Sequence, residues 1–431
     1  MKRFLIFIAF IFPLLLNAQQ HITLKNAIDA ALKNNFDIQI SRNVFEIGKT
    51  NNTFGMAGGL PTISASAGDN FSLNNGYQKY NTGTEVTSNN KQITNLNAGV
   101  NASMVLFNGF KITATKAKLN SLQRQSELQL NLQIQNTMAA VMLKYYDIVR
   151  QQCYLKIIQN SQDVSAKKLD IVNERSKVGM ANNVDILQAQ MDLNSSEQNL
   201  KLQQLVIDQA KTDLLLLMSS KKFDPISVND TIIIDKSIKL DSILTFLKQN
   251  PQYLSAEQEI KINEQIVKEI SAQRYPSLRI NTGYDFSNIK NDASSIWINQ
   301  NYGPSAGVSL IIPIYNGNAV RAERKAASFQ LSNAKLEKES LLNTLTANAM
   351  KTYQSYSSLL QQIDSQQKNY ELSKELVKTV MQNFKMNQAT ILDVKAAQTS
   401  FENAGYLLVN LQYAAKTNEI SLKQLIYRLG N

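Results

Sequence analysis

The chain has 431 residues and a formal net charge of +11, and it contains one cysteine and one histidine. Cys153 and His21 alone cannot supply a Cys/His zinc site, a disulfide framework or a nucleophilic triad. No Walker A, GxGxxG, HExxH or EF-hand sequence is present. The composition therefore argues against an enzyme and predicts no metal and no cofactor.

The positive charge is spread along helix-like segments and forms no dense basic block. Such a distribution is typical of a solvated helical surface. The alternative is a surface for nucleic acid or anionic lipid. We favour the solvated surface and predict no nucleic acid as a partner.

Residues 1–18 have the pattern of a secretory signal peptide. Lys2 and Arg3 precede an apolar run at 4–16, and Ala18 is a small residue suited to cleavage. A transmembrane helix needs about 20 apolar residues, so this run is too short to be one. We therefore expect an exported chain whose formal charge falls from +11 to +9 when Lys2 and Arg3 are removed. No later segment has the pattern of a transmembrane helix, so the mature chain either is soluble or crosses a membrane as β-strands.

Two similar segments indicate an internal duplication. The sequence "LFNG" at 106–109 is followed 208 positions later by "IYNG" at 314–317, and a long helix-like stretch follows each. Further landmarks recur at similar offsets, pairing Leu24 with Leu240, Pro61 with Pro276, and Asp185 with Asp393. We predict a signal peptide at 1–18, a first repeat at 19–222, a linker with a short strand at 223–238, and a second repeat at 239–431.

Each repeat is predicted to hold a helix, two strands, a very long helix, a tight turn and a last helix. Four strand segments of 10 to 13 residues alternate apolar with small polar side chains, from Pro61 to Leu73, Asn95 to Leu106, Leu278 to Ser287 and Ser305 to Ile314. Alternation fits a soluble sandwich or a transmembrane barrel. The length favours a barrel, because about 9 to 11 residues cross the hydrocarbon at a tilt.

A barrel would direct the polar face of these strands into a lumen. The candidate lumen residues are Asn95, Asn97, Asn101, Arg279, Asn281 and Asp285. Polar loops at 74–92 and 288–301 would connect the strands. Four strands cannot close a barrel, and an open edge in lipid leaves unpaired backbone groups, so several chains must contribute strands.

The helical segments are unusually long. No proline or glycine occurs from Lys111 to about Arg175, or after Gly317 to about Lys385. Apolar residues recur every seven positions from Tyr356 to Phe384, which is typical of coiled coils. Each long helix should be matched in length by two shorter helices placed end to end. For the first long helix these are expected at about 24–57 and 182–219, and for the second at 240–272 and 390–428.

Tight turns should join the long helices to the helices that follow. Gly179 and its counterpart Asn387 suit a left-handed residue at a helix end. Asn182 with Asp185, and Thr390 with Asp393, have the spacing of an N-cap with an acidic residue three positions later.

The duplicated strand exits and helix turns, in this order and twice, resemble the TolC-like outer membrane efflux protein family over nearly the whole mature chain. The resemblance implies a mixed α and β membrane protein that forms a homotrimer, with a shared barrel of twelve strands and a periplasmic α-barrel of twelve helices. It implies a location in the cell outer membrane, extending into the periplasm. Its implied partners are outer membrane lipid, an inner membrane pump and a periplasmic adaptor (membrane fusion protein). The barrel-to-helix junctions are then Asn108, Gly109, Asn316 and Gly317.

The resemblance also implies a periplasmic gate at the helix tips, where Asp185 and Asp393 match positions of acidic lumen residues. Some members have a second acid three residues after the later one, but Ala396 is found here and Lys395 lies beside Asp393. The alternative is that both carboxylates only stabilise helix starts, and the two roles are compatible. The turns with Gly179, Asn182, Asn387 and Thr390 are the candidate adaptor contact.

The predicted function is a passive outer membrane duct of a tripartite efflux or type I secretion system. The alternative is a soluble periplasmic coiled-coil scaffold or adaptor protein, which would need the strands to form a water-facing sandwich.

Overall fold

The computed structural model describes residues 20–292 and 296–429, so the predicted signal peptide lies outside the described residues. Contacts divide the chain into two compact units. Unit 1 consists of residues up to 40 with 131–250 and 343–431, and unit 2 of 41–130 with 251–342. Both units draw on both predicted repeats. The repeats and their boundaries remain a prediction about the sequence.

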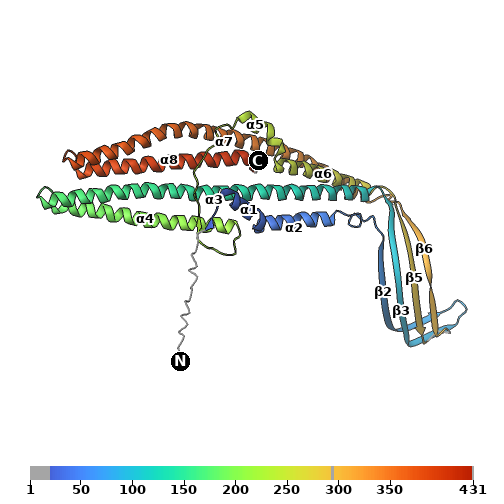
Figure 1. Cartoon of the computed structure of the whole chain (residues 1–431). Helices are drawn as coiled ribbons and strands as arrows, with labels where there is room; N and C mark the ends of the chain where they lie inside the picture. Colours follow the sequence, from blue (N-terminus) through green and yellow to red (C-terminus); the bar gives the residue numbers. More distant parts are fainter. Residues whose placement is uncertain (1–19, 293–295, 430–431) are drawn as a thin grey trace, which may run out of the picture. The chain divides into compact units, whose positions relative to one another are not determined.

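Unit 1 is built from helices that return on themselves as two hairpins (Figure 1). The first hairpin joins α3 (Lys111–Lys177) to α4 (Asn183–Leu217), and the second joins α7 (Ala319–Lys385) to α8 (Ile391–Leu425). The first part of α3 and of α7 belongs to unit 2. Unit 1 also holds α1 (Leu24–Asn34), α5 (Leu240–Phe246) and the 3-10 turn η1 (Leu247–Gln249).

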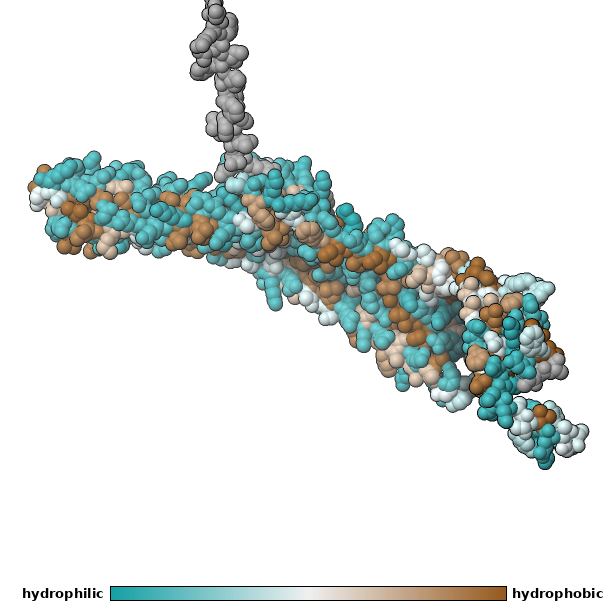
Figure 2. All heavy atoms as spheres, turned by 90° about the horizontal axis from the view of Figure 1, so that it is seen from below, coloured by the Kyte–Doolittle hydropathy of each residue, from teal (hydrophilic) through white to brown (hydrophobic). Residues whose placement is uncertain are grey.

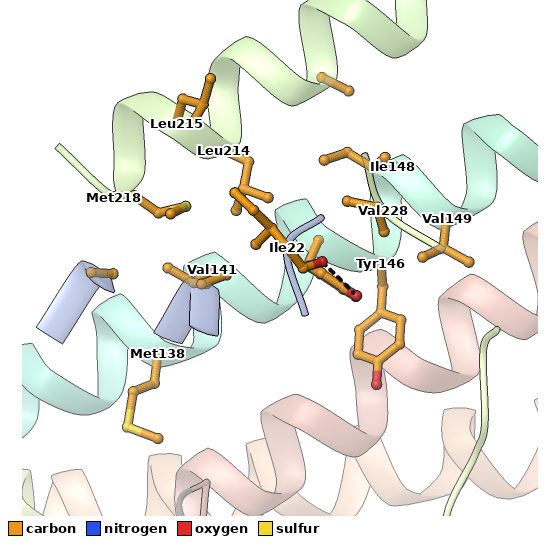
Figure 3. Close-up of a cluster of buried hydrophobic side chains, with 14 of the residues drawn as sticks. Ile22, Met138, Val141, Tyr146, Ile148, Val149, Leu214, Leu215, Met218 and Val228 are labelled. Carbon is orange, nitrogen blue, oxygen red and sulfur yellow. Dashed lines mark hydrogen bonds between the residues drawn. The ribbon is translucent and has the colours of Figure 1, made fainter. Parts of the chain in front are cut away.

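The main core of unit 1 surrounds the start of the described chain. Strand β1 (Gln20–His21) pairs in parallel with β4 (Ile226–Ser227), which confirms the short strand expected in the linker. Ile22 and Val228 are buried against α3 and α4, as Figure 3 shows for Leu214 and Ile148. The linker and the N-terminal strand are thus fastened to the long helices by apolar packing.

Unit 2 contains a four-stranded antiparallel sheet in the order β2-β3-β5-β6 (Figure 1). Its strands are β2 (Thr62–Lys79), β3 (Glu85–Asn108), β5 (Ser277–Asn291) and β6 (Ile298–Ile311). Helices α2 (Phe36–Asn51), most of which lies in this unit, and α6 (Pro251–Ala272) precede the two strand pairs. In the described part of the chain β2 and β6 each pair on one side only, so both edges of the sheet are open.

The strands differ from the predicted segments in two respects. They have 18, 24, 15 and 14 residues, because much of the expected loops at 74–92 and 288–301 continues the ladder. Polar residues rich in Asn and Thr pair there because a neighbouring strand accepts their backbone hydrogen bonds, with a bulge between Asn74 and Gly76. Conversely, β6 ends at Ile311, since Pro313 has no N–H to donate to a ladder.

Two predicted helices are each broken once. The helix expected at about 24–57 is α1 and α2, separated at Asn35, whose side chain accepts hydrogen bonds from the N–H groups of Asp37 and Ile38 and so caps α2. The helix expected at 240–272 is broken at Asn250 and restarts at Pro251, a residue favoured in the first turn. No helix in the described ranges is both long enough and apolar enough to cross a bilayer.

Candidate functional site

The two hairpin turns of unit 1 have the backbone geometry expected from the sequence. Gly179 has φ +76° and Asn387 has φ +64°, so each chain reverses through a left-handed residue. The N–H of Met180 donates to the carbonyl of Arg175, and that of Gln388 donates to the carbonyl of Asn383. Such bonds satisfy carbonyl groups left open at a helix end.

Both returning helices begin with a reciprocal capping box, again as expected. The side chain of Asn182 accepts from the N–H of Asp185, whose carboxylate accepts from the N–H of Asn182 at 3.2 Å. Thr390 and Asp393 repeat this arrangement. Hydrogen bonds from the Thr390 backbone and hydroxyl lower the pKa of Asp393 below its ordinary value. Both carboxylates therefore have a structural role, and their role in a gate remains a prediction.

The tips of the two hairpins share one apolar cluster. Val172 of α3, Ala189 of α4, Phe384 of α7 and Val394 of α8 are buried together. The guanidinium of Arg175 lies 4.4 Å from the centroid of the Phe384 ring and donates a hydrogen bond to the Phe384 carbonyl. The tip of one hairpin is thus held to the tip of the other by packing, a cation–π contact and a hydrogen bond.

A charged triad close to the tips was not predicted from the sequence. The side chain of Lys168 in α3 is completely buried and forms an ion pair with Asp192 of α4, which is 12% exposed. Lys395 of α8 binds the other carboxylate oxygen of Asp192 at 3.0 Å. Asp192 thus connects three helices from both hairpins, and Lys395 compensates Asp192 instead of Asp393.

The pKa of Asp192 shows which effect dominates in this triad. Burial alone would raise that pKa, but hydrogen bonds from Lys168 and Lys395 outweigh burial and hold it below its ordinary value. The carboxylate is therefore ionised throughout the neutral range. The sequence contains one signal for this triad, because Lys168 lies on a face of α3 whose other residues pack inward. Nothing in the sequence identified Asp192 as its partner.

In unit 2, strand pairing gathers the candidate lumen residues on one face of the sheet. Asn101 lies opposite Gly283, and Asp285 lies opposite Gly99. A Cβ atom on Gly99 would lie 2.5 Å from Asp285 Oδ1, and one on Gly283 would overlap Asn101, so glycine keeps room for both polar side chains. The six candidates on this polar face are Asn95, Asn97, Asn101, Arg279, Asn281 and Asp285.

The opposite face of the sheet is apolar and exposed. Figure 2 shows hydrophobic residues at the surface of the strand region in its view. Large apolar side chains on this face include Ile63, Phe71, Leu96, Val100, Ile280, Tyr284, Val308 and Leu310. An apolar surface of this extent needs a partner phase or a partner molecule.

The strand-to-helix junctions both contain two successive left-handed residues. Gly109 and Phe110 have φ +67° and +66°, between the end of β3 at Asn108 and the start of α3. The Asn108 side chain accepts from the N–H of Ile112 and so supports the first turn of α3.

The second junction repeats the backbone geometry but begins differently. Gly317 and Asn318 have φ +65° and +63° before α7 begins at Ala319. Asn316 does not end a strand directly, because residues 312–318, which belong to no strand or helix, separate β6 from α7.

Comparison with known proteins accounts for this combination of elements. The family described as Outer membrane efflux protein matches residues 27–220 and 243–426, which is most of the chain. The chain belongs to the outer membrane efflux protein family. This membership confirms the resemblance found in the sequence and places the chain in the outer membrane.

Three similar proteins share between 16% and 22% of their residues with this chain. Outer membrane protein TolC of Vibrio cholerae is 21% identical over 343 residues, 78% of this chain and 77% of that protein. Cation efflux system protein CusC of Escherichia coli is 22% identical over 408 residues, 92% of this chain and 85% of that protein. The crystal structure of the CmeC outer membrane channel of Campylobacter jejuni is 16% identical, with a TM-score of 0.78 over 94% of this chain and 85% of that chain. The family consists of channels and not of enzymes.

Proposed function

We propose that this protein is a passive outer membrane exit duct that receives its cargo from an inner membrane pump through a periplasmic adaptor. The observation that carries the proposal is the sheet of unit 2, which is open at both edges and has one exposed apolar face and one polar face. In lipid, unpaired edge groups cost several kcal/mol each. The sheet is therefore completed by further copies of the chain.

Strand direction allows such completion without a break in the antiparallel pattern. Successive neighbours from β2 to β6 are antiparallel, so β2 and β6 run in opposite directions. The β6 edge of one copy can then form an antiparallel pair with the β2 edge of the next copy. Three copies would give a barrel of twelve strands with the apolar face toward lipid, and the paired helices would form a twelve-helix periplasmic barrel.

The hairpin tips are the proposed gate and adaptor contact. Asp185 and Asp393 would form rings of carboxylates in a trimer, which favour cations over anions. A cavity of about 660 Å³ lies between α3 and α7 near the tips, with an apolar floor that includes Val377 and Met381 and a charged rim. A helix of the adaptor with one apolar face would fit such a surface.

Replacing Asp185 and Asp393 together by alanine is expected to enlarge the conductance of single channels in a planar bilayer. The change removes half of each capping box, which costs about 1 kcal/mol per cap, and so loosens both tips. An Asp163→Ala variant is the control, because Asp163 pairs with its helix neighbour Lys167 on an exposed face. Absence of any conductance from the wild-type protein would reject the duct, and equal conductance of all variants would reject the gate.

A further inference from the structure

Four basic side chains gather at the second strand-to-helix junction. They line a cavity of about 710 Å³ in unit 2 together with Ile314 and Tyr315, and no acid is among the described residues that line it. Two acidic residues of α6 form ion pairs with lysines outside this cluster, Glu257 with Lys338 and Glu269 with Lys118. In the described part of the chain no ion pair neutralises the four cations, which are Arg274, Arg321, Arg324 and Lys325.

An exposed apolar track leads along the sheet to this basic cluster. Val308 and Leu310 lie on the apolar face of β6 and are 67% and 60% exposed. Ile312 and Ile314 follow just after the end of β6, and Ile314, which lines the cavity, is 95% exposed. Tyr315 beside it is 78% exposed, and tyrosine side chains are enriched at membrane interfaces.

The first junction shows that the fold itself does not require these charges. At the 208-residue offset between the two junctions, Arg321 and Lys325 correspond to Thr113 and Ala117. The turn before the strands recurs at an offset of 215 residues, and there Arg274 corresponds to Gly59. Lys116, which corresponds to Arg324, donates to Asn52 and Asn120. The cavity at the first junction is lined by only two basic residues, Lys111 and Arg279. The denser cluster of four, in which Lys325 also lies 6.0 Å from the centroid of the Phe329 ring, therefore distinguishes the second junction.

We propose that this junction binds one anionic phospholipid, with its phosphate among Arg274, Arg321, Arg324 and Lys325 and its acyl chains along the apolar side of β6. Arginine binds phosphate through paired hydrogen bonds, and basic residues next to a membrane attract anionic headgroups. The inference rests on the proposed membrane-spanning sheet, because only then do the track and the cluster meet one lipid leaflet.

The test uses native mass spectrometry to measure phosphatidylglycerol retained by the full-length protein in detergent. Phosphatidylcholine, which is zwitterionic and has no net charge, is the comparison. Changing the four basic residues to glutamine is expected to weaken phosphatidylglycerol binding at least tenfold and to leave phosphatidylcholine binding unchanged. The matched control changes four exposed lysines of unit 1 to glutamine and retains wild-type binding; these are Lys201, Lys221, Lys222 and Lys248. A charge-conserving variant with lysine at the three arginine positions is expected to keep most of the affinity.

Three outcomes would overturn the inference. Equal phosphatidylglycerol binding by the glutamine variant and the control would show that the cluster does not bind lipid. Full displacement by inorganic phosphate at equal concentration would identify a free-anion site. A change of oligomeric mass in the glutamine variant with unaltered lipid retention would assign the cluster to contact between copies. Single-channel conductance separates these failures from failure of the duct, because the glutamine variant is expected to conduct like wild type.

Discussion

Replacing Asp192 by alanine is expected to destabilise the hairpin tips by roughly 3 to 5 kcal/mol, the cost of leaving a buried charge without its partner. Lys168 is completely buried, and Asp192 is its ion-pair partner in the structure. The loss also frees Lys395 of α8, so contact between the two hairpins weakens. Hydrogen exchange should accelerate on both sides of each turn, and channels in a bilayer should open more often.

Two further variants distinguish the effect of leaving a charge buried without its partner from the effect of removing any carboxylate. Asp163→Ala removes an exposed ion pair with Lys167 and should cost at most about 1 kcal/mol. Adding Lys168→Met to Asp192→Ala should recover much of the stability, since it removes the orphaned charge. Equal exchange rates in Asp192→Ala and Asp163→Ala would contradict the structural role of the triad.

The pH dependence of the tips follows from the same carboxylate. Because the pKa of Asp192 is lowered in the folded protein, its contribution is present above the unfolded value of about 4 and is lost as pH falls through the lowered pKa. Tip exchange corrected for intrinsic rates should therefore be constant from pH 8 to pH 5. A loss of protection between pH 7 and pH 5 would show that another group controls the tips.

Replacing Gly109 by alanine is expected to destabilise the first junction by roughly 3 kcal/mol or more. A left-handed backbone alone costs an L-residue about 1 to 2 kcal/mol. At Gly109 the new Cβ would also lie 2.6 Å from the carbonyl oxygen of Ala272 and 2.7 Å from Cβ of Tyr275. Neither atom belongs to a flexible side-chain end, so backbone must move, which adds about 1 to 3 kcal/mol.

Gly317 is the matched control within the same chain. It has nearly the same φ, +65° against +67°. Apart from its own chain neighbours, however, no atom of the described residues lies within 4 Å of its Cβ position. Gly317→Ala should therefore show only the backbone cost, and Gly317→Asn should be close to neutral because asparagine tolerates this conformation. Thermal unfolding midpoints are measured in detergent by circular dichroism. Equal midpoints for the two alanine variants would contradict this explanation.

Much of the architecture follows from local sequence patterns. The start of α3 at Lys111 was predicted, and its end at Lys177 lies close to the expected Arg175, because no proline or glycine interrupts the run. The two caps at Asn182 and Thr390 were predictable because a capping box needs only residues three positions apart. Alternation likewise assigned the residues to the correct faces of the sheet except at Leu106, where a bulge between Val105 and Phe107 shifts the register.

Features that depend on distant partners could not be predicted in this way. The break at Asn35 has a local part, the cap on α2, which asparagine commonly provides. It also has a distant part, because the Asn35 amide donates to the carbonyl of Leu217. The triad joins Lys168 to Asp192 and to Lys395, more than 200 positions away, so periodicity within one helix does not identify it. The strands exceeded their predicted length because pairing stabilises polar segments that resemble loops when considered alone.

The most direct test of the proposed function is the oligomeric mass of the mature protein. A single copy has a sheet whose edges β2 and β6 are open and whose apolar face is exposed. The protein should therefore require detergent for extraction and have the mass of a trimer in analytical ultracentrifugation with the detergent contribution removed. A stable, monodisperse monomer in plain buffer would contradict the shared barrel and, with it, the proposed duct.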